Sequence, residues 1–118
     1  MTPEEMKHRT KQFGLRVIRV VQTLPDNFVA RTVGNQLLRS GTSVGSNYRA
    51  ACRARSPAEF RAKLGIVEEE ADESAYWLEV LVDANLVRAE LLTELINEAN
   101  EIVAIVVSSI NTSRNATR

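Results

Sequence analysis

The residues of this sequence best suited to chemistry are a run of carboxylates, one histidine and one cysteine. Glu69 and Glu73 lie one helical turn apart in the carboxylate run, as a pair of metal ligands would. A carboxylate-bridged di-iron centre in a helical bundle also needs Glu-x-x-His pairs on two helices, whereas the only histidine, His8, lies near the N-terminus. We therefore predict no metal site and no cofactor.

Nucleophilic catalysis has no better support in the sequence. A Ser or Cys nucleophile needs a base held beside it and an oxyanion-stabilising turn, and Cys52 is far from His8 along the chain. The glycine-containing stretch 41–45 lacks the Lys-Ser/Thr ending and the preceding strand of a phosphate-binding loop. We expect a protein that is not an enzyme and has no small-molecule substrate, with Cys52 as a small buried thiol.

Apolar residues recur at helical spacing in four segments, and hydroxyl-proline pairs at Thr2-Pro3 and Ser56-Pro57 cap two of them. We predict helices over about 3–24, 27–54, 57–84 and 88–112, with a frayed tail at 113–118. A loop at 40–47 that would split the second helix is the alternative. Residues 1–118 then form one all-α domain, an antiparallel up-down-up-down four-helix bundle.

The predicted second helix has two stripes beside each other on a helical wheel. Its glycines, Gly34, Gly41 and Gly45, form a smooth line into which a neighbouring helix can pack closely. Its core stripe consists of Val29, Val33, Leu37, Val44, Tyr48 and Ala51.

Charge is distributed unevenly along the 118 residues, although the formal net charge is zero. Residues 1–55 carry ten basic side chains and three acidic ones, whereas residues 56–118 carry five basic and twelve acidic. Either the basic half docks on the acidic half, within the bundle or between subunits, or a basic surface meets phosphate. A single cysteine, no secretory signal and no membrane-spanning apolar run lead us to expect a cytoplasmic protein without membrane contact.

One face of the predicted third helix mixes large apolar groups with carboxylates within an arc of about 100°. Tryptophan is common at interface centres because it buries a large area while its N–H still finds a partner. We predict a homo-oligomer interface on this face; in the alternative, Trp77 only covers the core of its own bundle. The predicted interface residues are Ile66, Glu69, Glu70, Glu73, Trp77 and Val80.

Four arginines of the predicted second helix lie opposite its core stripe, within an arc of about 80°. We call Arg31, Arg39, Arg49 and Arg53 the arginine ridge. The planar guanidinium pairs equally well with carboxylate and with phosphate. The ridge could therefore join a neighbour's carboxylates, or stay open and bind RNA or DNA.

Two stretches resemble a bacterial family of four-helix bundles that includes the ribosomal-RNA intervening-sequence proteins. The first is Gln36-Leu37-x-Arg39-Ser40-x-x-Ser43-Val44-x-x-Asn47, and the second runs from Arg55-Ser56-Pro57-Ala58-Glu59-Phe60 to Glu69-Glu70-Ala71-Asp72-Glu73. The resemblance implies a small cytosolic bundle that assembles as a homo-oligomer, typically a pentamer. A related accessory protein of diversity-generating retroelements is a strongly basic pentamer that binds nucleic acid and a reverse transcriptase, whereas this chain is neutral overall, so the resemblance implies the fold and the oligomer and not nucleic-acid binding.

Overall fold

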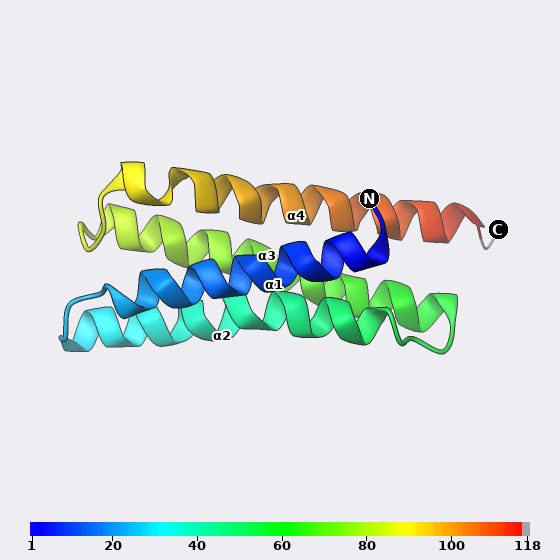
Figure 1. Cartoon of the computed structure of the whole chain (residues 1–118), viewed down its shortest axis with the longest axis horizontal. Helices are drawn as coiled ribbons and strands as arrows, with labels where there is room; N and C mark the ends of the chain where they lie inside the picture. Colours follow the sequence, from blue (N-terminus) through cyan, green and yellow to red (C-terminus); the bar gives the residue numbers. More distant parts are fainter. Residues whose placement is uncertain (117–118) are drawn as a thin grey trace.

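The computed structural model describes residues 1–116 and contains four α-helices: α1 (Pro3–Gln22), α2 (Phe28–Ala51), α3 (Pro57–Asp83) and α4 (Ala89–Ala116). Successive helices run antiparallel and pack against each other in chain order, forming an elongated bundle of 50 × 22 × 20 Å (Figure 1). The predicted all-α, up-down-up-down bundle is confirmed. This topology brings the start of α1, the α2–α3 connection and the end of α4 to one end of the molecule (Figure 1).

The caps anticipated for α1 and α3 are present. The Thr2 hydroxyl accepts a hydrogen bond from the backbone N–H of Glu5 at 3.1 Å, and the Ser56 hydroxyl accepts one from Glu59 at 3.1 Å. The Glu59 carboxylate reaches back and accepts the backbone N–H of Arg55 at 3.1 Å. Each helix start thus satisfies amide donors that would otherwise lack partners.

The end of α3 is also specified by the local sequence. Asn85 adopts a left-handed conformation with φ of 59°, which an asparagine tolerates. The backbone N–H of Leu86 then reaches the carbonyl of Leu81 at 2.9 Å, while that of Asn85 reaches Val82 at 3.0 Å. These two bonds form a Schellman motif, which turns the chain sharply toward α4.

Three helix ends differ from the prediction, and the first is that of α1, which ends at Gln22 instead of residue 24. Helix α2 is continuous, so the alternative of a loop at 40–47 is wrong, but α2 ends at Ala51 because Arg53 and Ala54 tighten into i to i−3 hydrogen bonds. Helix α4 continues to Ala116, so the predicted frayed tail is wrong for residues 113–116. No proline or glycine interrupts α4, and the Arg61 guanidinium donates to the Ser113 hydroxyl at 3.2 Å. Residues 117–118 lie outside the described part of the chain.

The core lies along the bundle axis and contains most of the predicted stripe of α2. Val29 is the exception, since 55% of its surface is exposed. The neighbouring Ala30 is buried instead, so the first turn of α2 directs Ala30 and not Val29 toward the rest of the bundle. Val29 and Phe28 therefore leave an exposed apolar end at the start of α2.

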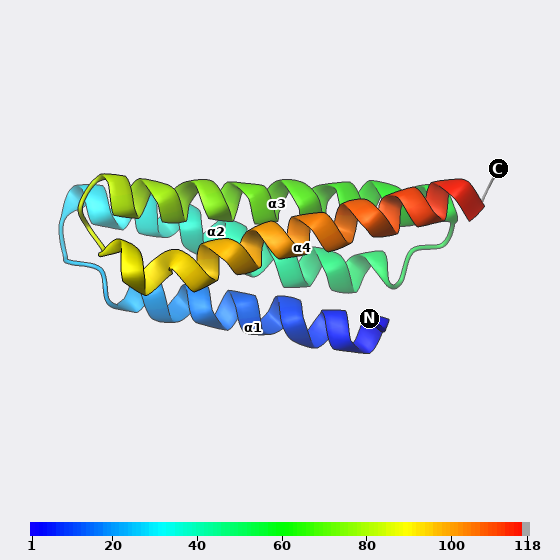
Figure 2. The same ribbon diagram turned by 90° about the horizontal axis from the view of Figure 1, so that it is seen from above.

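The helix pairs differ in how closely they pack. Helix α1 approaches α2 along the predicted glycine line, where a Cβ added at Gly41 would lie 2.7 Å from both methyl groups of Val17. By contrast, α4 crosses α1 obliquely, and the two helices are close over only a short stretch (Figures 1 and 2). In that stretch Arg9 of α1 donates two hydrogen bonds to Glu98 of α4, both at 2.7 Å, and one to Glu101 at 2.8 Å.

Candidate functional site

The six predicted interface residues lie on α3, on the side that faces solvent and borders α2. Ile66 is 37% exposed and Glu69 is exposed, whereas Trp77 and Val80 are half-buried and pack against the core. Trp77 thus covers part of its own bundle and still presents a surface to solvent. The remaining two residues, Glu70 and Glu73, are half-buried.

Glu70 and Glu73 find their cationic partner within the same chain. Arg39 of α2 pairs with Glu70 at 3.0 Å and also with Glu73. The indole N–H of Trp77 donates to Glu73 at 3.0 Å. The hydrogen bond from Trp77, followed by the contact with Arg39, holds the pKa of Glu73 below its ordinary value. These four residues, which we call the Arg39 network, fix the Trp77 ring at the α2–α3 boundary.

Tyr76 is an exposed residue of this face that the sequence analysis missed. Tyr76 is 56% exposed, and its ring packs edge-to-face with that of Trp77, with ring centroids 4.9 Å apart and an interplanar angle of 75°. On the helical wheel Tyr76 lies only about 20° beyond Glu69, so a slightly wider arc would have included it. Ile66, Tyr76 and Trp77 give α3 an exposed apolar strip, which we call the α3 strip.

The four residues of the arginine ridge are all exposed, but the ridge is not one uniform surface. Arg31 pairs with Asp26 at 2.6 Å, and Arg39 belongs to the Arg39 network. Arg49 and Arg53 form no ion pair within residues 1–116. Only the C-terminal half of the ridge thus remains available for an external anion.

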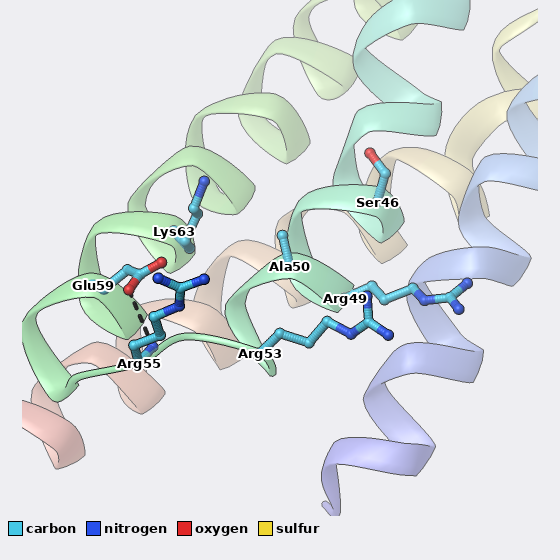
Figure 3. Close-up of a pocket in the computed structure, with 7 residues that line it drawn as sticks. All are labelled: Ser46, Arg49, Ala50, Arg53, Arg55, Glu59 and Lys63. Atoms are coloured by element: carbon cyan, nitrogen blue, oxygen red, sulfur yellow. Dashed lines mark hydrogen bonds between the residues drawn. The ribbon is translucent and has the colours of Figure 1, made fainter.

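Arg49 and Arg53 border a surface hollow of about 460 Å³ between the end of α2 and the start of α3 (Figure 3). Arg55 of the connection and Lys63 of α3 also line it, with Ser46, Ala50 and Glu59. The arginine ridge as predicted from the sequence includes neither Arg55 nor Lys63. The α2–α3 turn brings Lys63 to this hollow, and a helical wheel of α2 alone cannot show that.

Cys52 and His8, the two residues considered for nucleophilic catalysis, lie at the end of α2 and on α1. Cys52 is half-buried at the end of α2, where its neighbour is the phenol of Tyr48. Burial, reinforced by Cys52, raises the pKa of Tyr48 to about 12. His8 is exposed on α1. Within residues 1–116, no three His, Cys, Asp or Glu side chains are grouped so that they could hold a metal ion.

None of the helices in the described part of the chain combines the length and the apolar character needed to cross a lipid bilayer.

Comparison with known proteins identifies the family. Residues 4–108 match the family described as 23S rRNA-intervening sequence protein. Among solved structures, the chain is similar to a protein of unknown function from the S23 ribosomal protein family of Bacteroides thetaiotaomicron VPI-5482. The two share 34% sequence identity and a TM-score of 0.85, over 94% of this chain and 99% of the other. No curated protein matches. The resemblance seen in the sequence is thus confirmed, and the chain belongs to the 23S rRNA-intervening sequence protein family.

Proposed function

We propose that this chain is a non-enzymatic cytoplasmic scaffold or interaction protein that works as a homo-oligomer, with the α3 strip at the subunit interface. The family resemblance favours a pentamer. The observation that carries the proposal is the α3 strip itself, in which Tyr76 is exposed beside the half-buried Trp77 and Ile66 is exposed about three turns earlier on the same face of α3. Aromatic and aliphatic groups exposed on one face of a rigid helix are typical of interface centres.

The Arg39 network supports burial of this face in an interface. Carboxylates are costly to remove from water unless they are paired and hydrogen-bonded. Glu70 and Glu73 already have Arg39 and the Trp77 indole as partners within the chain, so a neighbouring subunit need not supply them. Glu69 is exposed and has no ion-pair partner in the described part of the chain, so it suits the solvated rim of the interface.

Light scattering of an Ile66→Asp variant tests the proposal. The wild-type protein should be an oligomer, and Ile66→Asp should shift it toward the monomer because a carboxylate cannot be buried without a partner. Val107→Asp is the matched control, since Val107 is also 37% exposed but lies on α4. Circular dichroism verifies that both variants remain helical.

The combination Trp77→Ala with Val80→Asp is a more severe variant of the same face, but both residues also pack against the core. Ile66→Asp is therefore the cleaner substitution. A monomeric wild type, or an Ile66→Asp protein that assembles as well as Val107→Asp, would refute an interface at the α3 strip.

A second candidate function is the binding of RNA or DNA by the arginine ridge. One observation favours it: Arg49 and Arg53 remain without an ion pair in the described chain, although the protein has as many acidic as basic side chains. Such binding should be strong at about 50 mM salt and weaken as salt rises, because phosphate contacts release counterions. Absence of binding at low salt would remove this candidate.

A further inference from the structure

The end of α2 and the start of α3 bring four cations around one hollow. Arg49 lies in the last turn of α2, and Arg53 lies in the tight turn that follows Ala51. Arg55 lies in the connection and Lys63 in the second turn of α3 (Figure 3). We call these four residues the basic corner.

The charge of the basic corner is not compensated within the described chain. Glu59 is the only carboxylate lining the hollow, and it accepts the backbone N–H of Arg55. None of the four cationic side chains forms an ion pair with another described residue. Arg9 and Arg39, by contrast, each pair with two carboxylates of the acidic half. An anion from outside the bundle would therefore complete the basic corner.

The donors of the basic corner suit phosphate. Guanidinium forks bind phosphate oxygens in two-pronged fashion, and an ammonium such as that of Lys63 contributes a further point charge. Ser46 lines the same hollow, but its hydroxyl donates to the carbonyl of Ser43 at 3.2 Å, so the cations are the donors on which phosphate binding rests. None of the lining residues is aromatic or a large apolar group, so the hollow provides no platform on which a base could stack.

The basic surface continues past the corner onto α1. A second hollow, of about 530 Å³, shares Ser46 and Arg49 with the first and is also lined by Lys11, by the apolar Leu15 and by Glu4, whose carboxylate pairs with Lys7. The cationic track thus runs over three helices, from Lys11 through Arg49 and Arg53 to Lys63. A single phosphate would occupy only part of it, whereas successive phosphates of one strand would follow its length.

We propose that the basic corner and Lys11 form a sequence-independent binding track for the phosphodiester backbone of a polynucleotide. This inference rests on the second candidate function and moves the binding surface away from Arg31 and Arg39, which already have partners. RNA and DNA share the phosphodiester chemistry, so both are probes in the test.

Fluorescence anisotropy with a labelled single-stranded RNA and the matching DNA tests the site at about 50 and 200 mM salt. Arg53→Glu should weaken binding of both probes at least about tenfold and reduce the salt dependence, because a phosphate contact is lost. Arg31→Glu is the matched control, since it makes the same charge change near the opposite end of α2, at a residue paired with Asp26. It should change the affinity less than about twofold.

Three results separate the possible failures. No binding by the wild type would overturn both the site and the second candidate function. Equal weakening by Arg53→Glu and Arg31→Glu would leave nucleic-acid binding standing but refute the basic corner. Inorganic phosphate at millimolar concentration is also tested as a competitor, against unlabelled RNA at the same concentration of phosphate groups. If the two compete equally well, the site binds single phosphates and the track is refuted. Light scattering of Arg53→Glu measures whether the variant keeps the oligomeric state of the wild type, so that a loss of binding is not confused with a loss of self-association.

Discussion

At the scale of single residues, glycine decides how closely α1 and α2 pack. A Cβ built at Gly41 would lie 2.7 Å from both methyl groups of Val17 and 2.9 Å from its Cβ. Val17 is fully buried, so it has no room to move away. Gly65 of α3 differs, because a Cβ there would meet nothing within 4 Å.

The substitutions Gly41→Ala and Gly65→Ala should therefore change stability in opposite directions. Each gains up to about 1 kcal/mol of helix propensity, but Gly41→Ala also overpacks the core at a cost of about 1–3 kcal/mol. We expect Gly41→Ala to lower the free energy of unfolding and Gly65→Ala to raise it. Urea denaturation at one protein concentration measures both, and equal stabilisation would show that α1 and α2 are not in close contact at Gly41.

The residues of the arginine ridge show which surface features can be predicted from a single sequence. A helical wheel correctly places Arg31, Arg39 and Arg49 on the exposed side of α2, because that depends only on helix period, whereas Arg53 is exposed in the turn after the helix. It cannot show that Arg39 meets Glu70 and Glu73, because that depends on the register between α2 and α3. The partner of each arginine, and hence the available part of the ridge, required the structure.

At the scale of elements, helix starts were easier to predict than helix ends. The caps at Thr2 and Ser56 are local hydrogen bonds between residues three apart, so a short stretch of sequence specifies them. The extension of α4 to Ala116 involves Arg61, which is 52 residues away from its partner Ser113. A contact of that separation leaves no local pattern, and the polar composition of the tail suggested fraying instead.

The oblique crossing of α1 and α4 makes Arg9 a principal connection between these two helices. Its partner Glu98 is only 15% exposed, and the hydrogen bond from Arg9 is the main cause that holds the pKa of Glu98 below its ordinary 4.5. Replacing Arg9 by methionine keeps much of the aliphatic stem but leaves Glu98 without its principal cation. We expect the free energy of unfolding at pH 7 to fall by about 1–2 kcal/mol.

The effect of Arg9→Met should depend on pH. A carboxylate with a depressed pKa contributes stability above the unfolded pKa, and that contribution is lost as pH falls through the folded pKa. The difference between wild type and Arg9→Met should therefore be full at pH 7 and shrink below about pH 4. Lys7→Met is the control, since the Lys7–Glu4 pair is exposed and should contribute less than about 0.5 kcal/mol. A pH-independent loss in Arg9→Met would indicate lost packing instead of a lost ion pair.

At the scale of the whole molecule, the uneven charge of the sequence appears in two forms. Near the middle of the bundle, Arg9 and Arg39 join the basic half to carboxylates of the acidic half. At the end of the molecule where α2 meets α3, the basic corner remains uncompensated (Figures 1 and 3). Both interpretations drawn from the sequence, docking of the two halves and a free basic surface, thus describe parts of the same molecule.

Salt should separate the two proposed activities of this molecule. The Debye length falls from about 10 Å at 0.1 M salt to about 3 Å at 1 M, which weakens phosphate contacts at an exposed corner but not apolar burial at the α3 strip. We expect the oligomer to persist in light scattering from about 0.05 to 0.5 M salt, while polynucleotide binding is lost over the same range. Dissociation of the oligomer by salt, together with an Ile66→Asp protein that still assembles, would instead mean that basic and acidic surfaces of neighbouring subunits hold it together. In that case the basic corner would be occupied in the assembly, and Arg53→Glu would disrupt the oligomer.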